Sequence, residues 1–379
     1  MSIICNDENN KTELENDLDI NTKNEDSIYP MNDIKIEKGF YTVFELKRKF
    51  DSKNKRIILD SDFQRDDVWG KEKKCELIES VLMGLPLPIF YFNQDKYGRL
   101  IVVDGRQRLT ALFEFMDDKI TLRKLKILSE LNDKKFSQLS PVLAGRIEDY
   151  QIQAHVILPP TPDRIKFDIF DRVNRGGMQL NKQEIRNALY QGQATVLLKA
   201  VTCGDNFKKA TGDSFKKEQR MKDKYLITRF LSLYLFDMGK LLDDDGKPYI
   251  YKGDRDELFG KGLEFVNKMQ PGDVKRLQNI IEDNLCKSYY YLGKDAFRIV
   301  NNGIRSPINM NIFEAIMFIM NKIPKSLPKE PVATKINDFI MSNEFKDNIG
   351  NYRDSVNKLM WRIDKAKCIG EDLKKEYDK

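Results

Sequence analysis

Histidine is almost absent from this sequence, because its 379 residues include a single one, His155. HNH and HEXXH metal sites, histidine pairs of the phospholipase type and mixed Cys/His zinc clusters all need more than this. A Ser-His-Asp triad needs only one histidine, but no GxSxG sequence accompanies it here. Apolar and polar residues alternate around His155, which predicts a strand with a packed or hydrogen-bonded imidazole.

Clustered cysteines and long apolar runs are missing as well. The five cysteines are scattered, odd in number and contain no CxxC pair, which argues against a disulfide framework and a zinc site. No apolar run has the length needed to cross a bilayer, and the N-terminus lacks a signal-peptide pattern. We therefore expect a cytoplasmic protein with no membrane partner.

Charge is abundant but unevenly distributed. Residues 1–37 carry ten Asp or Glu against three Lys, a net charge of −7, whereas residues 38–379 carry 62 Lys or Arg against 49 Asp or Glu, a net charge of +13. The acidic leader 1–37 has no periodic apolar face, so we expect it to be disordered. The basic remainder is compatible with phosphate or nucleic-acid partners.

The pattern of elements predicts an α+β domain over residues 38–192 and a helical domain over 193–379. In the first part, Thr42 and Glu45 form a capping-box signature, and helical spacing over 71–83 ends at Gly84. Strands are expected at 56–60 and 89–92, with 99–104 returning as the partner of the latter. Several short strands and a small helix are expected over 119–160. Beyond residue 193, amphipathic helical patterns follow one another and strands are scarce.

The segment "DGRQR", residues 104–108, joins a buried strand to a helix. Gly105 permits a tight turn and the close approach of a ligand, and the amides of a helix N-terminus favour an anion. Arg106 and Arg108 suit phosphate oxygens, Asp104 suits Mg²⁺ or a water molecule, and Gln107 suits a nucleophilic water or a base edge. In the alternative interpretation, a hairpin strand precedes a charged helix start whose arginines face solvent.

Two further stretches carry polar residues in loops. In "FQRDDVW", residues 63–69, Gln64 and Arg65 lie between Phe63 and Trp69, which could stack on a base or simply anchor the core.

The second of these stretches is "FDIFDRVNRGGMQLNKQEIR", which joins two helices by a double glycine. Asn174, Arg175 and the amides of Gly176 and Gly177 can form an anion nest there. The same pattern fits a plain helix-turn-helix connection, with DNA binding as its functional form. A second helix is expected after Asn181.

Taken together and in this order, the three stretches closely resemble the N-terminal domain of GmrSD-type restriction systems, of the ParB/sulfiredoxin-like class. The resemblance covers roughly residues 38–192. The family signature DGQQR appears here as DGRQR, with Arg106 in place of the first Gln. This departure leaves Gln107 available to orient water and adds a cation for a triphosphate.

The resemblance implies a domain that binds and hydrolyses a nucleoside triphosphate with Mg²⁺ and regulates attack on modified or foreign DNA in anti-phage defence. The matching positions imply catalytic roles for Asp104, Gln107 and Arg108, with Asp104 also the metal ligand. Those implied to bind the nucleotide are Gln64, Arg65, Gly105, Arg106, Asn174, Gly176 and Gly177.

Relatives that cut DNA carry an HNH domain after this one, and no histidine follows His155 here. Residues 193–379 are therefore not an HNH nuclease, and cutting would need a separate nuclease subunit or an unrelated metal-dependent site that no motif in the sequence marks. Two alternatives to a nucleoside triphosphatase stay open, namely a DNA-binding or nicking protein that uses the same basic cleft and a non-hydrolysing scaffold. The nucleotide base, a homo-oligomeric state and the role of the helical domain are also left open.

Overall fold

The computed structural model describes residues 34–59, 69–95, 97–159, 161, 165–166, 169–170, 172, 181–216, 220–243, 245–301, 304–349 and 355–377. These residues divide into two compact units, which we call the N-terminal unit (up to Leu189) and the C-terminal unit (from Tyr190). The break lies close to the boundary expected between residues 192 and 193. Among the helices of this described part, none combines the length and apolar character that a membrane crossing needs.

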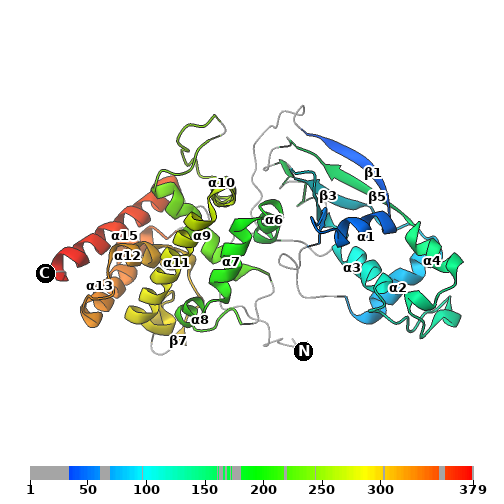
Figure 1. The fold of residues 1–379 in the computed structure, drawn as a ribbon. Coiled ribbons are helices and arrows are strands. Elements are labelled where there is room, and N and C mark those ends of the chain that lie inside the picture. Colours follow the sequence, from blue (N-terminus) through cyan, green and yellow to red (C-terminus); the bar gives the residue numbers. More distant parts are fainter. Residues whose placement is uncertain are drawn as a thin grey trace, which may run out of the picture. The chain divides into compact units, whose positions relative to one another are not determined.

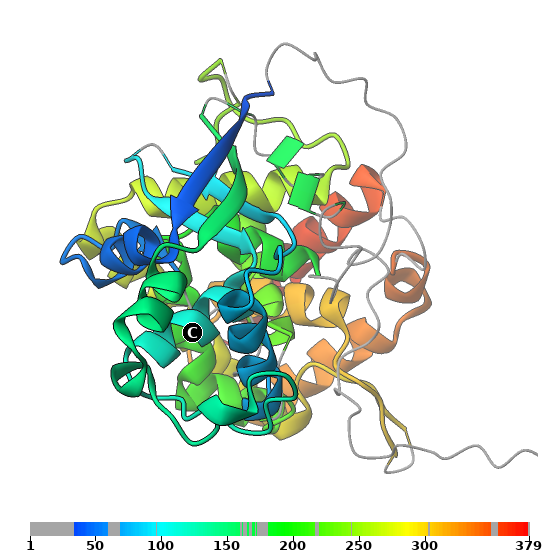
Figure 2. The ribbon, with the colours of Figure 1, turned by 90° about the vertical axis from the view of Figure 1, so that its right-hand side faces the viewer.

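The N-terminal unit is built on a mixed sheet. Its described strands are β1 (Ile36–Thr42), β2 (Ile57–Ile58), β3 (Phe90–Gln94), β4 (Leu100–Asp104) and β5 (Gln151–Ile157). They are arranged in the order β1-β5-β3-β4-β2, with β1/β5 and β3/β4 antiparallel and β3/β5 and β2/β4 parallel. Figure 2 shows β1 as the long strand beside β5 at the edge of the sheet. The expected hairpin of 89–92 with 99–104 is confirmed.

Helices cover both faces of this sheet. The described ones are α1 (Val43–Asp51), α2 (Lys71–Leu82), α3 (Arg106–Met116), α4 (Pro141–Glu148) and α6 (Lys182–Leu189), with 3-10 turns at Ser129–Leu131 and Phe136–Gln138. Helices α1 to α4 lie on one face (Figure 1), where Phe90, Phe92 and Val102 alternate inward and pack with Leu109 and Leu112 of α3. On the other face, a smaller cluster forms from Val103, Ile157, Phe170 and Ile185 of α6.

The local signals read from the sequence form as expected. The Thr42 hydroxyl accepts a hydrogen bond from the Glu45 amide at 3.1 Å and starts α1. At α6 the capping box is complete, because Asn181 Oδ1 accepts from the Glu184 amide at 2.9 Å and Glu184 Oε2 from the Asn181 amide at 2.6 Å. Gly84 follows α2 with φ of +73°.

Two expectations differ from the structure. Of the strand expected at 56–60, the described residues up to 59 form only the part Ile57–Ile58. Within 119–160, β5 and α4 form, but side-chain caps take the place of the other short strands. Glu79 of α2 accepts hydrogen bonds from the Ile127 and Leu128 amides, each at 2.8 Å. Backbone donors satisfied by a side chain need no partner strand.

The C-terminal unit is mainly helical, as expected. Its described helices are α7 (Gln193–Cys203), α8 (Asp205–Thr211), α9 (Lys222–Asp237), α10 (Arg255–Lys268), α11 (Pro271–Leu292), α12 (Met310–Lys322), α13 (Lys329–Met341), α14 (Asn343–Asp347) and α15 (Val356–Tyr377). A 3-10 turn at Gly293–Asp295 and a small hairpin of β6 (Val300–Asn301) and β7 (Ile304–Arg305) complete it. Helix α12 contacts α9, α11 and α15 and is buried over most of its surface (Figure 1).

An ion triad lies in the core of the C-terminal unit. Arg229 Nε of α9 is 2.6 Å from Glu314 Oε1 of α12, and Arg362 Nη2 of α15 is 3.5 Å from Glu314 Oε2. All three side chains are 1–2 % exposed. Arg362 also donates to the Asn348 carbonyl at 2.7 Å. The triad therefore ties three helices to one buried carboxylate.

Candidate functional site

The junction of β4 and α3 holds the DGRQR residues. Strand β4 is buried until it ends at Asp104, Gly105 then turns the chain with φ of +99°, and α3 begins at Arg106. The N-cap residue of α3 is Gly105, so no side chain caps this helix, and the first turn of α3 contains no acidic residue. A helix N-terminus of this kind presents amide donors and a partial positive charge to an anion.

Gly105 is required at this turn for two physical reasons. Its positive φ is strained for residues with a side chain. In addition, a Cβ at this position would lie 2.1 Å from Cδ1 of the Phe90 ring. The Phe90 ring of β3 therefore occupies the space that a side chain at residue 105 would need.

Arg108 points into the N-terminal unit. Its guanidinium donates to the carbonyls of Pro88 and, at 3.4 Å, Ile89, and lies 3.0 Å from Asp104 Oδ2. It is also 4.0 Å from the centroid of the Phe90 ring. Only 8 % of the residue is exposed. Burial lowers the pKa of Arg108, and the neighbouring Asp104 carboxylate opposes that shift. The alternative of arginines that face solvent is wrong for Arg108.

Asp104 is the exposed partner of this pair. Its side chain is 40 % exposed, and Arg108 occupies one lone-pair direction of one carboxylate oxygen, so acceptor sites for a further ligand remain. Within the described ranges, no group of three or more His, Cys, Asp or Glu residues could hold a metal ion. A lone carboxylate fits the way Mg²⁺ binds beside substrate phosphates, because that ion keeps several waters and needs few protein ligands.

Arg106 and Gln107 occupy the first turn of α3 and are both half-buried. Gln107 Oε1 is buried and has no hydrogen-bond partner within the described residues. A buried acceptor without a partner carries a free-energy cost, and at a functional site a ligand or water satisfies it. This oxygen is the observation at the junction that points most directly to a further occupant.

The other sequence-predicted residues, Gln64, Arg65, Asn174, Gly176 and Gly177, lie outside the described residues. Their approach to Gly105 therefore stays a prediction. Trp69, at the edge of the described chain, packs against the core of the N-terminal unit with Lys73 Nζ 4.7 Å from its ring centroid. This confirms its interpretation as a core anchor.

Helix α6 contributes polar residues that the sequence analysis did not single out as site residues. Gln183, Glu184, Arg186 and Asn187 are each only 1–3 % exposed. The helix contacts β4, and its Ile185 packs with Val103, the residue before Asp104. Polar side chains at positions i, i+1, i+3 and i+4 form one broad face of this helix, opposite Ile185, which was the available signal. The helix that packs on β4 therefore carries a buried polar face.

His155 lies in β5, as its sequence pattern predicts. Its ring centroid is 5.3 Å from that of Tyr91 on the neighbouring strand β3. The imidazole is therefore a packed, half-buried side chain of the sheet.

Comparison with known proteins gives a family for the first part of the chain. Residues 45–191 match the model of the family described as "GmrSD restriction endonuclease, N-terminal domain". No curated protein and no solved structure matches the chain at the significance required. The matched range contains the β4–α3 junction, helix α6 and all three stretches on which the resemblance rests. Residues 45–191 are therefore a GmrSD restriction endonuclease N-terminal domain.

Proposed function

We propose that the N-terminal unit binds a nucleoside triphosphate at the β4–α3 junction and hydrolyses it with Mg²⁺, as the regulatory or sensor part of a bacterial restriction system. The buried Gln107 Oε1 beside the uncapped N-terminus of α3 is the observation that carries the proposal. Membership in a restriction-system family supports the context of anti-phage or modified-DNA defence.

In this proposal the residues of the junction have separate roles. The first-turn amides of α3 and Arg106 bind phosphate oxygens, and Asp104 is the carboxylate beside Mg²⁺. Gln107 orients the attacking water. Mg²⁺, when bound, neutralises charge that develops on the phosphates. Phosphoryl transfer needs this alignment and charge stabilisation more than covalent participation of the protein.

Arg108 has a different role from the one that the family resemblance implies. Because its guanidinium binds the Pro88 and Ile89 carbonyls and Asp104, we assign it as a positioning residue. It holds the Asp104 carboxylate at the end of β4 and fixes the start of β3. Contact with the triphosphate is left to Arg106 and to the residues of the two loops outside the described part.

DNA cleavage is assigned to a separate nuclease subunit, because residues 193–379 contain no histidine for HNH chemistry. The C-terminal unit then serves the regulatory task, as a connection to such a partner or to DNA. This assignment rests on the sequence and on the family context.

Thermal-shift measurements with each of the four ribonucleoside triphosphates and Mg²⁺ test the proposal. A ligand bound only by the native state raises the unfolding midpoint, so at least one triphosphate is expected to do so and to release phosphate on incubation. Arg106→Ala and Gln107→Ala should reduce both effects. The matched control, Arg123→Ala, changes an exposed arginine elsewhere in the same unit and should leave both unchanged.

Two results would contradict this function. If no triphosphate shifts the midpoint, but a DNA duplex binds without nucleotide and Arg106→Ala weakens that binding, the junction holds DNA phosphate. If neither ligand binds there, the domain is a scaffold.

A further inference from the structure

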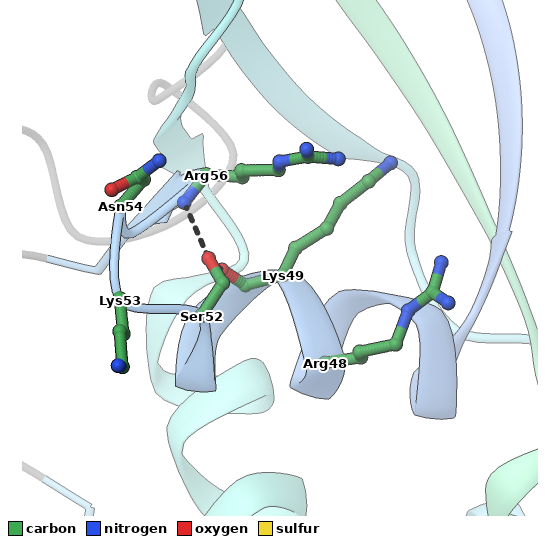
Figure 3. A pocket seen from close by; sticks show the side chains of 6 residues that line it. All are labelled: Arg48, Lys49, Ser52, Lys53, Asn54 and Arg56. Atoms are coloured by element: carbon green, nitrogen blue, oxygen red, sulfur yellow. Dashed lines mark hydrogen bonds between the residues drawn. The ribbon is translucent and has the colours of Figure 1, made fainter.

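A basic groove lies at the other end of β4 from the DGRQR junction. It consists of two adjoining hollows of about 320 and 360 Å³ that share Lys49 and Arg56. The first is lined by Arg48, Lys49, Ser52, Lys53, Asn54 and Arg56 (Figure 3), and the second by Tyr41, Lys49, Arg56, Gln94, Tyr97, Gly98, Arg99 and Leu100. We call this surface the basic groove.

The basic groove is separate from the proposed nucleotide site. Arg56 precedes β2 and Arg99 precedes β4, and these two strands are parallel, with Ile57 opposite Leu100. Both cations therefore lie at the amino ends of their strands, whereas Asp104 ends β4. At the usual rise per residue, the five residues of β4 set the two sites about 16 Å apart.

The groove has an excess of positive charge. Two of its cations are paired, Lys49 with Glu45 and Arg99 with Asp95, each at 2.6 Å. Arg48, Lys53 and Arg56 are exposed and form no ion pair with the carboxylates of the described chain. Figure 3 shows the cationic ends of Lys49 and Arg56 on the same side of the hollow.

The helix macrodipole explains only part of this charge. Arg48 and Lys49 lie in the last turn of α1, where cations favour the negative end of the helix. Lys53 and Arg56 lie beyond that turn, and Arg99 comes from the β3–β4 hairpin. Cations from three segments thus converge on one surface.

Aromatic rings lie among these cations. Tyr97 is 71 % exposed, and Arg99 Cζ is 5.5 Å from its ring centroid. Tyr41 is half-buried, with Lys49 Nζ 4.8 Å from its ring. Guanidinium and ammonium groups beside an exposed ring and a half-buried one suit a chain of phosphates whose sugars and bases pass along the surface.

We propose that the basic groove binds the phosphate backbone of a DNA strand. Lys49 and Arg56 line both hollows, so cations lie along two adjoining depressions, which suits an extended polyanion. The unpaired cations include two arginines, whose planar forks match phosphate oxygens. The ligand differs from the nucleotide of the proposed function, and the site lies elsewhere on the domain.

Fluorescence anisotropy with the full chain tests this inference, using a fluorescein-labelled duplex of about 20 base pairs and its single strand, without nucleotide. The variant Arg48→Gln/Arg56→Gln removes two exposed charges. We expect it to weaken DNA binding by roughly 5- to 10-fold and to reduce the slope of log K against log salt by about 2. Tyr97→Ala should weaken single-strand binding more than duplex binding, because stacking needs an unpaired base.

The matched control is Lys126→Gln/Lys134→Gln, which removes two exposed charges from another surface of the same unit. It should keep the parent affinity and salt slope. Binding of Arg48→Gln/Arg56→Gln at the parent affinity would overturn the inference, as would an equal loss in the control, which would reduce the effect to net charge. A third outcome would also contradict the inference: Arg48→Gln/Arg56→Gln binds DNA at the parent affinity but no longer shows the thermal shift with triphosphate. An unchanged triphosphate shift with weaker DNA binding supports two separate sites.

Discussion

The side chain of Arg108 points into the N-terminal unit, which its neighbours in the sequence do not indicate. It lies between Gln107 and Leu109 in the first turn of α3, yet its guanidinium turns inward to two carbonyls of the segment before β3 and to Asp104. These bonds use the donors that would otherwise reach a phosphate. Arg106, two residues earlier, lies on another side of the helix and remains the arginine of this turn assigned to a ligand.

Arg108→Lys separates positioning from direct phosphate contact. A lysine has three donors on a flexible stem and cannot reproduce the planar fork between the Pro88 carbonyl and Asp104. We expect a loss of about 2–4 kcal/mol in the free energy of unfolding, measured by urea denaturation. The exposed control Arg123→Lys should change it by less than about 0.5 kcal/mol. Full stability with lost hydrolysis would instead place Arg108 on the triphosphate.

Gly105→Ala tests the packing of the turn. The added Cβ meets the Phe90 ring at 2.1 Å and must adopt φ of +99°. Overpacking and backbone strain together should lower the free energy of unfolding by about 2 kcal/mol or more. Gly84→Ala is the control, because its φ of +73° is also positive but no atom lies within 4 Å of its Cβ position. An equal loss in both variants would leave strain as the sole cause.

At the scale of elements, α2 holds the loop after α3 through one carboxylate. Glu79 accepts hydrogen bonds from the amides of Ile127 and Leu128 and, at 3.4 Å, of Lys126. Burial alone would raise the pKa of Glu79, but these amides outweigh it and hold the pKa below its ordinary value. The loop is thus ordered by a charge on a neighbouring helix and not by strand pairing.

The lowered pKa of Glu79 predicts a pH dependence. A carboxyl group with a lower pKa in the folded state stabilises the fold above its unfolded pKa of about 4.5, and this contribution is lost as the pH falls through the folded value. Glu79→Gln should therefore cost about 2 kcal/mol at pH 7 and much less at pH 3. Urea denaturation across this range measures it. A cost that is the same at both pH values would exclude the charge as its source.

At the scale of the whole molecule, the described chain contains two cores of different kinds. One is a sheet with helices on both faces, and the other is a set of helices around α12 with the Arg229–Glu314–Arg362 triad inside it. Each core is made by residues of its own unit. The proposed nucleotide site and the basic groove both belong to the N-terminal unit. A substitution that destabilises the core of the C-terminal unit should therefore leave ligand binding at both sites unchanged.

Glu314→Gln tests this independence. It leaves two buried guanidiniums without their carboxylate, which should destabilise the C-terminal unit by about 3–5 kcal/mol. Calorimetry should show one transition shifted down, while the transition that triphosphate raises stays in place. The surface variant Glu371→Gln, which breaks an exposed pair with Lys322, should leave both transitions close to their parent positions. A downward shift of the triphosphate-sensitive transition in Glu314→Gln would show that the units unfold together.

Local patterns determined much of this protein from the sequence alone. The α+β and helical parts, the caps at Thr42 and Asn181, the β3–β4 hairpin and the glycine turn at residue 105 depend on residues close together in the chain, so neighbours suffice to predict them. The family also follows from short stretches kept in order.

Only the tertiary structure decided which distant side chains lie next to one another. Parallel pairing of β2 with β4 brought Arg56 beside Arg99, the carbonyls before β3 drew Arg108 inward, and packing on β4 buried Ile185 of α6. These contacts join segments that are distant along the chain, and no local pattern encodes them.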